Sequence, residues 1–358
     1  TMKKIAPACL LIALICATTA CTSKTKQQDS NADPFEIKVE NIEAESRINV
    51  TVNGELFTSY MYADTFEKPF IFPIVAANGT TVTRGYPIES REGESVDHPH
   101  HTGYWFTYGY VNGIDFWGNS KMIPDSIKHR YGTIRLKSIH KIESLPDRGI
   151  IELSQEWVNP DGSIPIEEHV TYTFYAGKDY RIIDRISTLS TSMPEVSFAD
   201  TKEGAFAIRV AKFLEFPSDR PQKYIDDYGN ITEVPAVNNE GVNGNYLSSE
   251  GIEGGEVWGK RAKWMNLHGV QGSDTLSLVI MDHPSNLNYP TYWHARTYGL
   301  FSANPFGVKD FTEGEEELNF LLKEGEILAF KHRLLIKSGN EFSAPEIETN
   351  WKKFTEQY

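Results

Sequence analysis

Short runs of alternating apolar and polar residues recur along this chain and predict β-strands almost throughout. Residues 48–52 and 56–60 are two such runs, and Asn53-Gly54 between them is a dipeptide that favours a type I′ hairpin turn. Residues 330–336 repeat the alternation near the end of the chain. Further runs are joined by turn sequences in the same way: 104–111 with 114–117 across Asn112-Gly113, and 150–158 with 166–175 and 180–189.

Only the C-terminus has a clearly helical pattern. Ser343 and Glu346 have the spacing of a capping box at a helix start. The apolar residues that follow share one helical face: Ile347, Trp351, Phe354 and Tyr358. The many strands and the 17 Tyr, 19 Phe and 7 Trp predict an all-β protein, a large antiparallel β-sandwich with a short C-terminal helix. No break in composition divides residues 36–358, so we expect a single domain there.

The N-terminal residues have the pattern of an export signal. Lys3 and Lys4 precede an apolar run at 5–16, and small residues then lead to Cys21. We expect residues 1–20 to be a signal peptide, and residues 21–35 to be a lipidated Cys21 followed by a polar tether. Such a protein would be held at a membrane in the periplasm or at the cell surface. An ordinary signal peptide with a chance cysteine is the alternative.

Charge and cysteine content narrow the partners. The net charge of −14 disfavours nucleic acid as a ligand. No second apolar run is long enough to span a membrane, so we expect contact with the membrane through the lipid anchor only. The three cysteines lie at positions 9, 16 and 21, so the exported domain has no disulfide. A carbohydrate or another small molecule is the expected ligand.

The first polar cluster is the segment 97–105, which holds His98, His100 and His101. Clustered imidazoles suit proton transfer near neutral pH or metal ligation. In an extended segment His98 and His100 share one side and His101 faces the other, so at most two would face one site. His100 and His101 are our candidates for acid–base catalysis. A hydrogen-bonded loop without a catalytic role is the alternative.

The second cluster contains two carboxylates beside a lysine. Asp200 and Glu203 flank Lys202, and Arg209 follows on a predicted strand. A carboxylate next to a cation suits acid–base catalysis, with Lys202 and Arg209 binding the ligand. A solvated loop before a strand has the same appearance.

The third cluster combines histidines with aromatic residues and hydrogen-bond donors. His283 and His294 are further candidates for proton transfer, and Arg296 and Asn304 for ligand binding. Trp105 and Trp258 are candidate stacking surfaces for a sugar ring. A buried structural network is the alternative. No cofactor is predicted; a divalent metal remains an alternative, with His98, His100 and His283 as its ligands.

Several blocks together resemble the PmoA-like family of exported bacterial proteins of unknown function. The blocks are 97–105 (DHPHHTGYW), 112–117 (NGIDFW), 200–210 (DTKEGAFAIRV), 283–286 (HPSN) and 293–307 (WHARTYGLFSANPFG), and the resemblance covers about residues 45–340. The family's label as a methane oxygenase subunit is not carried over, because a real subunit spans the membrane several times. The resemblance implies a carbohydrate context. The layout is also similar in character to galactose-mutarotase-like supersandwiches, which host epimerases, lyases and glycosidases.

These patterns lead to three hypotheses about function. The first is an exported lipoprotein that acts on a sugar or glycoside as an enzyme with histidine and carboxylate acid–base chemistry. The second is a glycan-binding lipoprotein without catalysis, and the third is a metal-dependent hydrolase or oxygenase. For the first, we expect the three polar clusters to meet on one face of a sheet, because buried charges are less costly when they share partners.

Overall fold

The computed structural model describes residues 1–2, 35–226, 228–234 and 238–358, and Phe35–Tyr358 form one unit. The predicted signal peptide, Cys21 and the tether lie outside the described residues, except for the residues at their ends. None of the described helices is both long and apolar enough to cross a membrane.

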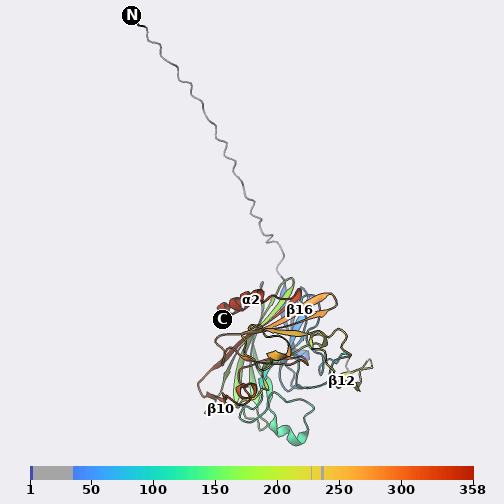
Figure 1. Ribbon diagram of the computed structural model, residues 1–358. Coiled ribbons are helices and arrows are strands. Elements are labelled where there is room, and N and C mark those ends of the chain that lie inside the picture. Colours follow the sequence, from blue (N-terminus) through green and yellow to red (C-terminus); the bar gives the residue numbers. More distant parts are fainter. Residues whose placement is uncertain (3–34, 227, 235–237) are drawn as a thin grey trace. The chain divides into compact units, whose positions relative to one another are not determined.

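Two eight-stranded antiparallel sheets form the domain (Figure 1). The first sheet has the spatial order β1 (Ile37–Ile42), β2 (Arg47–Val52), β3 (Glu55–Met61), β4 (Phe70–Ile74), β5 (Tyr104–Tyr108), β11 (Gly204–Arg209), β18 (Leu300–Asn304), β17 (Tyr292–Ala295). The second has the order β14 (Asn245–Ser248), β15 (Trp264–Gln271), β16 (Asp274–Asp282), β20 (Leu328–Gly339), β9 (Tyr180–Ser190), β8 (Ile166–Ala176), β7 (Gly149–Val158), β6 (Thr133–Ser144).

The remaining elements are short apart from the last helix. Two ribbons pair β10 (Glu195–Phe198) with β19 (Phe320–Lys323), and β12 (Gln222–Ile225) with β13 (Ile231–Val234). The α-helices are α1 (Val308–Phe311) and α2 (Ala344–Gln357). The 3-10 turns are η1 (Glu43–Glu45), η2 (Asp125–Arg130), η3 (Lys212–Leu214) and η4 (Gly254–Val257).

The two Asn-Gly turns behave differently. Asn53 and Gly54 have φ of 52° and 85°, as a type I′ turn requires, and they join β2 to β3 as predicted. Asn112-Gly113 also has positive φ, but across this turn the structure has only an isolated bridge between Val111 and Ile114. The predicted strand 114–117 is wrong, because Asp115 Oδ1 accepts hydrogen bonds at 2.8 Å from the backbone N–H groups of Trp117 and Gly118 and turns the chain.

Aromatic side chains fill the space between the two sheets. Phe57 of β3 meets Phe174 of β8 with ring centroids 6.1 Å apart. Phe106 of β5 meets Phe330 of β20 at 5.4 Å. The strands supply these side chains by alternation, since every second residue of β7 is buried. The predicted large antiparallel β-sandwich with a short C-terminal helix is confirmed.

Helix α2 covers the outer face of the second sheet, near β16 in Figure 1. Ile347 and Phe354 are fully buried there against apolar residues of β15, β16 and β20. The predicted capping box is present, with the Ser343 backbone N–H donating to the Glu346 carboxylate at 2.9 Å. The outer face of the first sheet is covered instead by loops, and Trp117 from one of them packs on Trp105 and Ala207. The candidate site lies on this face.

Candidate functional site

The histidine segment forms a tight turn. The His101 backbone N–H donates to the His98 carbonyl oxygen at 2.9 Å, and His98 has a positive φ of 43°. The turn stacks the rings of His98 and His101 with centroids 4.7 Å apart and planes 5° apart. The Tyr298 ring is also parallel to the His98 ring, with centroids 5.0 Å apart. The prediction from an extended segment, that His98 and His101 face opposite sides, is therefore wrong.

Two buried arginines hold this turn in place. Arg84 Nη1 and Arg209 Nη2 lie 2.5 and 2.8 Å from the same carboxylate oxygen of Asp97. Arg84 also donates to the carbonyl oxygens of His98 and His101. Burial raises the pKa of Asp97, but the two guanidinium groups and the His98 side chain outweigh that effect and hold its pKa well below the usual range.

Arg209 acts beneath the site and not in it. Its side chain is fully buried on β11 and does not line the cavity described below. Besides Asp97 it contacts Ser95 Oγ at 3.1 Å and His101 Nδ1 at 3.3 Å. Its predicted role in ligand binding is thus replaced by a positioning role. Arginine cannot accept a hydrogen bond, so His101 accepts at Nδ1 and carries its proton on Nε2.

Trp105 forms the floor under the histidines. It is 1% exposed and lies 5.4 Å from the His101 ring, so it offers no surface to a ligand. Its predicted stacking role is wrong because its position on β5 places it under the loops. Trp117, which the sequence reasoning passed over, does line the cavity, and its ring meets His101 edge to face at 5.7 Å.

The three predicted clusters meet at one cavity of ≈ 260 Å³, which we call the histidine cavity. Its lining comes from four separate segments: His98, His100, His101, Asp115, Trp117, Gly118, Lys202, Glu203, His294, Arg296 and Tyr298. The structure thus brings together six of the residues singled out for catalysis or ligand binding: His100, His101, Lys202, Glu203, His294 and Arg296. Their individual roles stay predictions.

His294 presents an unpaired nitrogen. Its Nδ1 lies 2.7 Å from the Lys202 carbonyl oxygen, which can only accept, so Nδ1 carries the proton. Its Nε2 is buried and has no partner within the described residues. Burial, with a smaller contribution from Arg296, lowers the pKa of His294 to about 3. His294 is therefore a neutral hydrogen-bond acceptor at the cavity.

Two carboxyl groups also face the cavity. Lys202 Nζ lies 3.2 Å from Glu203 Oε1. Asp115 was not among the predicted site residues, although it lies inside the block 112–117. Burial raises the pKa of Asp115, and the negative charge of Glu203 acts in the same direction. This shift could not be predicted from the sequence, because it depends on the burial of Asp115 and on its approach to Glu203. Tyr298, on the loop between β17 and β18, was likewise missed.

Two predicted catalytic residues lie elsewhere. Asp200 accepts hydrogen bonds from the backbone N–H groups of Lys309 and Asn319 at 3.0 and 2.6 Å, so it fastens the loop after β18. His283 Nδ1 lies 2.8 Å from Ser285 Oγ, and its ring packs on Phe354 of α2. Both are structural in this fold, which corrects their assignment.

Two predicted ligand-binding residues also fall outside the cavity lining. Asn304 is fully buried on β18 and donates to the Thr201 carbonyl oxygen at 3.0 Å, so it positions the loop that carries Lys202. Trp258 is half-buried with its ring 5.4 Å from the Arg296 guanidinium. It supports Arg296 from behind and does not itself line the cavity.

The alternative metal site is not assembled as proposed. His98 and His100 are neighbours, with ring centroids 5.6 Å apart, but His283 packs on α2 away from the cavity. Within the described residues, no group of three or more His, Cys, Asp or Glu side chains is arranged to hold a metal ion.

A comparison with protein families matches residues 47–352 to a family of unknown function, DUF6807. The chain belongs to this family. No curated protein matches it. The resemblance to the PmoA-like family stays a prediction.

Solved structures of low identity share parts of the fold. A galactose 1-epimerase from Lactobacillus acidophilus is 7% identical with a TM-score of 0.34, over 86% of this chain and 100% of that one. An α-galactosidase from Geobacillus stearothermophilus is 11% identical with a TM-score of 0.39, over 85% of this chain and 41% of that one. The galactosidase domain of an α-galactosidase–sucrose kinase is 8% identical with a TM-score of 0.39, over 84% of this chain and 41% of that one. This chain thus spans less than half of the two galactosidase chains. Likeness at this level carries no argument about activity.

Proposed function

We propose that this family member acts on a sugar or glycoside in the histidine cavity, by acid–base chemistry. The observation that carries the proposal is the meeting of two carboxyl groups with several hydrogen-bonding side chains in one cavity. Asp115, Glu203 and His294 come from segments far apart in the sequence. Clusters of titratable groups with shifted pKa values, gathered in a cleft, are typical of catalytic sites.

Asp115 and Glu203 divide the acid and base roles in this proposal. The raised pKa of Asp115, caused by burial and then by Glu203, is the direction that a general acid needs near neutral pH. Glu203, with the Lys202 ammonium 3.2 Å away, supplies the opposing carboxylate as the base. Two carboxyl groups that face one cavity in different environments are the arrangement used to move a proton onto and off a sugar oxygen.

The other lining residues suit a sugar ring. A pyranose needs partners for its hydroxyl groups and an aromatic face for its C–H groups. His294 Nε2 is a free acceptor, while Arg296 supplies donors. The indole of Trp117 and the stacked rings of His98 and Tyr298 supply the flat surfaces. His100 completes the wall.

Non-catalytic glycan binding is the second candidate, and the histidines favour it. Burial is the main cause that lowers the pKa of His100 to about 2 and of His294 to about 3. Both rings stay neutral at pH 7 and are weak bases, so they suit hydrogen bonding to hydroxyl groups better than proton transfer. We therefore assign the acid–base role that the sequence suggested for His100 to the carboxyl groups of Asp115 and Glu203.

A glycoside and aldose panel tests the proposal. Purified protein would be assayed for hydrolysis, elimination and epimerisation by NMR, beside Asp115→Asn, Glu203→Gln and Glu356→Gln. Glu356 is exposed on α2, so the last variant is a matched control for loss of one carboxylate. We expect turnover to fall about 10²- to 10⁴-fold in the first two variants and to be unchanged in the control.

Other outcomes decide between the candidates. Sugar binding by the wild type and by both site variants, with no turnover of any compound, would replace the enzyme by a binding protein. Absence of both binding and turnover across the panel would reject both. Export and lipid anchoring through Cys21 form part of the proposal and rest on the sequence pattern alone.

A further inference from the structure

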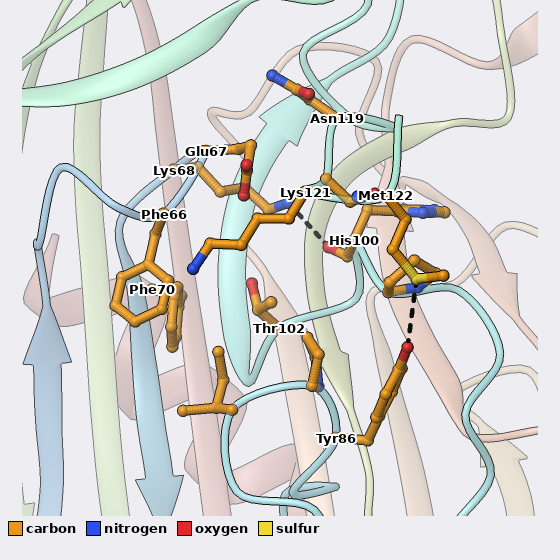
Figure 2. A pocket seen from close by; sticks show the side chains of 14 residues that line it. Phe66, Glu67, Lys68, Phe70, Tyr86, His100, Thr102, Asn119, Lys121 and Met122 are labelled. Carbon is orange, nitrogen blue, oxygen red and sulfur yellow. Dashed lines mark hydrogen bonds between the residues drawn. The ribbon is translucent and has the colours of Figure 1, made fainter. Parts of the chain in front are cut away.

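A second cavity, of ≈ 240 Å³, lies on the other side of His100, and we call it the lysine cavity (Figure 2). Its walls are mainly apolar, with Phe66, Phe70, Ile88 and Met122 among the lining residues. Because His100 lines both cavities, a ligand in the histidine cavity has a neighbouring space to extend into.

Lys68 is the unusual residue of this cavity. It is 4% exposed, and its Nζ donates to the His100 carbonyl oxygen at 2.8 Å, as the dashed line in Figure 2 shows. An ammonium has three donors, and this is its one hydrogen bond to a described residue. No carboxylate of the described chain lies within 4.0 Å of it to form an ion pair. Lys68 is thus a buried cation without an ion pair among the described residues; its Nζ lies 5.7 Å from the Trp105 ring, and the charges of Glu67 and Asp115 act on it from beyond ion-pair distance.

Two polar atoms in the lining of the lysine cavity lack partners. Thr102 Oγ1 and Asn119 Oδ1 are buried and make no hydrogen bond with any described residue. Lys121 lines the same cavity from an exposed position, with its Nζ 5.5 Å from the Phe66 ring. Buried polar atoms in folded proteins almost always have partners, so two unpaired oxygens beside a buried ammonium with a single hydrogen bond indicate a polar ligand group in this cavity.

The positive charge of Lys68 indicates that the ligand group in the lysine cavity is negatively charged. Burial lowers the pKa of Lys68 to about 8, with Glu67 and Asp115 opposing the shift. The side chain is still mainly protonated at pH 7. A neutral donor would suffice to hold the His100 carbonyl oxygen, so that bond does not account for a buried charge. A buried charge is costly unless it is paired, and an anion placed in the cavity would supply the pair.

We propose that the lysine cavity receives an anionic group of the substrate, which makes the substrate a hexose that carries a carboxylate or a sulfate. The anion forms an ion pair with Lys68 and accepts a hydrogen bond from the Thr102 hydroxyl group. The sugar ring occupies the histidine cavity beside His100. This inference rests on the proposed function for the ring and adds the class of substrate.

Calorimetry with three hexoses tests this pairing: glucuronate, glucose 6-sulfate and glucose, each with its galactose counterpart. We expect at least one anion to bind about 10- to 100-fold more tightly than its neutral counterpart, the range for a charge-assisted hydrogen bond. Lys68→Met should abolish that preference, measured within the variant as the ratio of anionic to neutral hexose binding. Lys121→Met removes the same charge from an exposed position and should keep most of the preference.

A pH series on the wild type provides a second measurement that needs no variant to fold. The preference for the anion should fall as the pH rises above about 8, where Lys68 loses its proton, while neutral hexose binding stays constant. Whether carboxylate or sulfate binds in this Lys68-dependent way identifies the anion, and either supports the inference.

Three results would overturn it. Equal binding of neutral and anionic hexoses by the wild type would refute the anion site and leave the proposed function standing. An equal loss of both kinds of binding in Lys68→Met, with a lower melting temperature, would make Lys68 a purely structural residue. Binding of no hexose at all would remove the proposed function and this inference with it.

Discussion

Replacing Arg209 by methionine should weaken the fold and disorganise the histidine turn. Arg209 is fully buried, and its guanidinium contacts Asp97, Ser95 and His101 at 2.8, 3.1 and 3.3 Å. Methionine matches the aliphatic stem of arginine in length, so the variant keeps the packing of the stem and removes the charged end with its hydrogen bonds. The perturbation therefore tests the guanidinium group and its contacts, and not the aliphatic part of the side chain.

The magnitude follows from what remains beside Asp97. Breaking a buried ion pair costs about 3–5 kcal/mol when the partner charge is left uncompensated. Asp97 keeps Arg84 at 2.5 Å, and its side chain is 36% exposed, so part of that loss is avoided. We expect the free energy of unfolding to fall by about 2–3 kcal/mol, which is less than the cost of a fully buried pair because Asp97 is partly exposed and keeps Arg84 as a partner.

Stability against pH should change as well. The pKa of Asp97 is held below its ordinary value in the folded state, so its ionisation stabilises the fold above about pH 4. This contribution is lost as the pH falls below that value towards the folded-state pKa. In Arg209→Met the pKa of Asp97 moves back up, so the loss of stability on acidification should be shallower than in the wild type.

Urea denaturation at several pH values measures both effects, with Arg148→Met as control. Arg148 is 40% exposed and pairs with its neighbour Asp147, so its loss should change stability by less than about 0.5 kcal/mol. The reasoning is refuted if the free energy of unfolding of Arg209→Met lies within about 0.5 kcal/mol of the wild-type value. It is also refuted if stability falls as steeply on acidification in the variant as in the wild type. Sugar binding should weaken in the variant, because the turn that places His98 and His101 loses a support.

Two further predictions concern the core and the N-terminus. Glu168→Gln should lower the free energy of unfolding by about 3–5 kcal/mol, because it leaves the fully buried Arg185 without its carboxylate; a loss below about 1 kcal/mol in urea denaturation would contradict this. Cys21→Ser should move the protein from the membrane fraction to a soluble or unprocessed form, and mass spectrometry that finds an unmodified mature terminus elsewhere in the wild type would refute the lipid anchor.

The sequence by itself determined features that depend on neighbouring residues. The hairpin at Asn53-Gly54 and the capping box of Ser343 and Glu346 form as predicted, because positive φ and side-chain capping are local interactions. Strand alternation located β7 to β9 for the same reason. The strand expected after Asn112-Gly113 does not form, because the Asp115 side chain accepts hydrogen bonds from the backbone N–H groups of Trp117 and Gly118.

Only the tertiary structure decided which polar residues form the site. Residue type alone pointed to Glu203, His294 and Arg296, and all three reach one cavity. The same reasoning assigned Asp200 and Arg209 to the ligand, but the fold turns Asp200 towards backbone N–H groups and buries Arg209 under the histidines. Whether a side chain faces a cavity depends on strand register and loop packing, which involve residues far apart in the chain.

Burial also created the properties that composition could not reveal. Asp115 lies in the block 112–117 and Lys68 lies outside all the family-like blocks, and neither residue type nor spacing marks either of them as a site residue. Removal from water raises the pKa of Asp115 and lowers the pKa of Lys68 to about 8. Desolvation depends on every segment that packs around a group, so these two residues acquire their chemical character only when the sandwich and its covering loops are assembled.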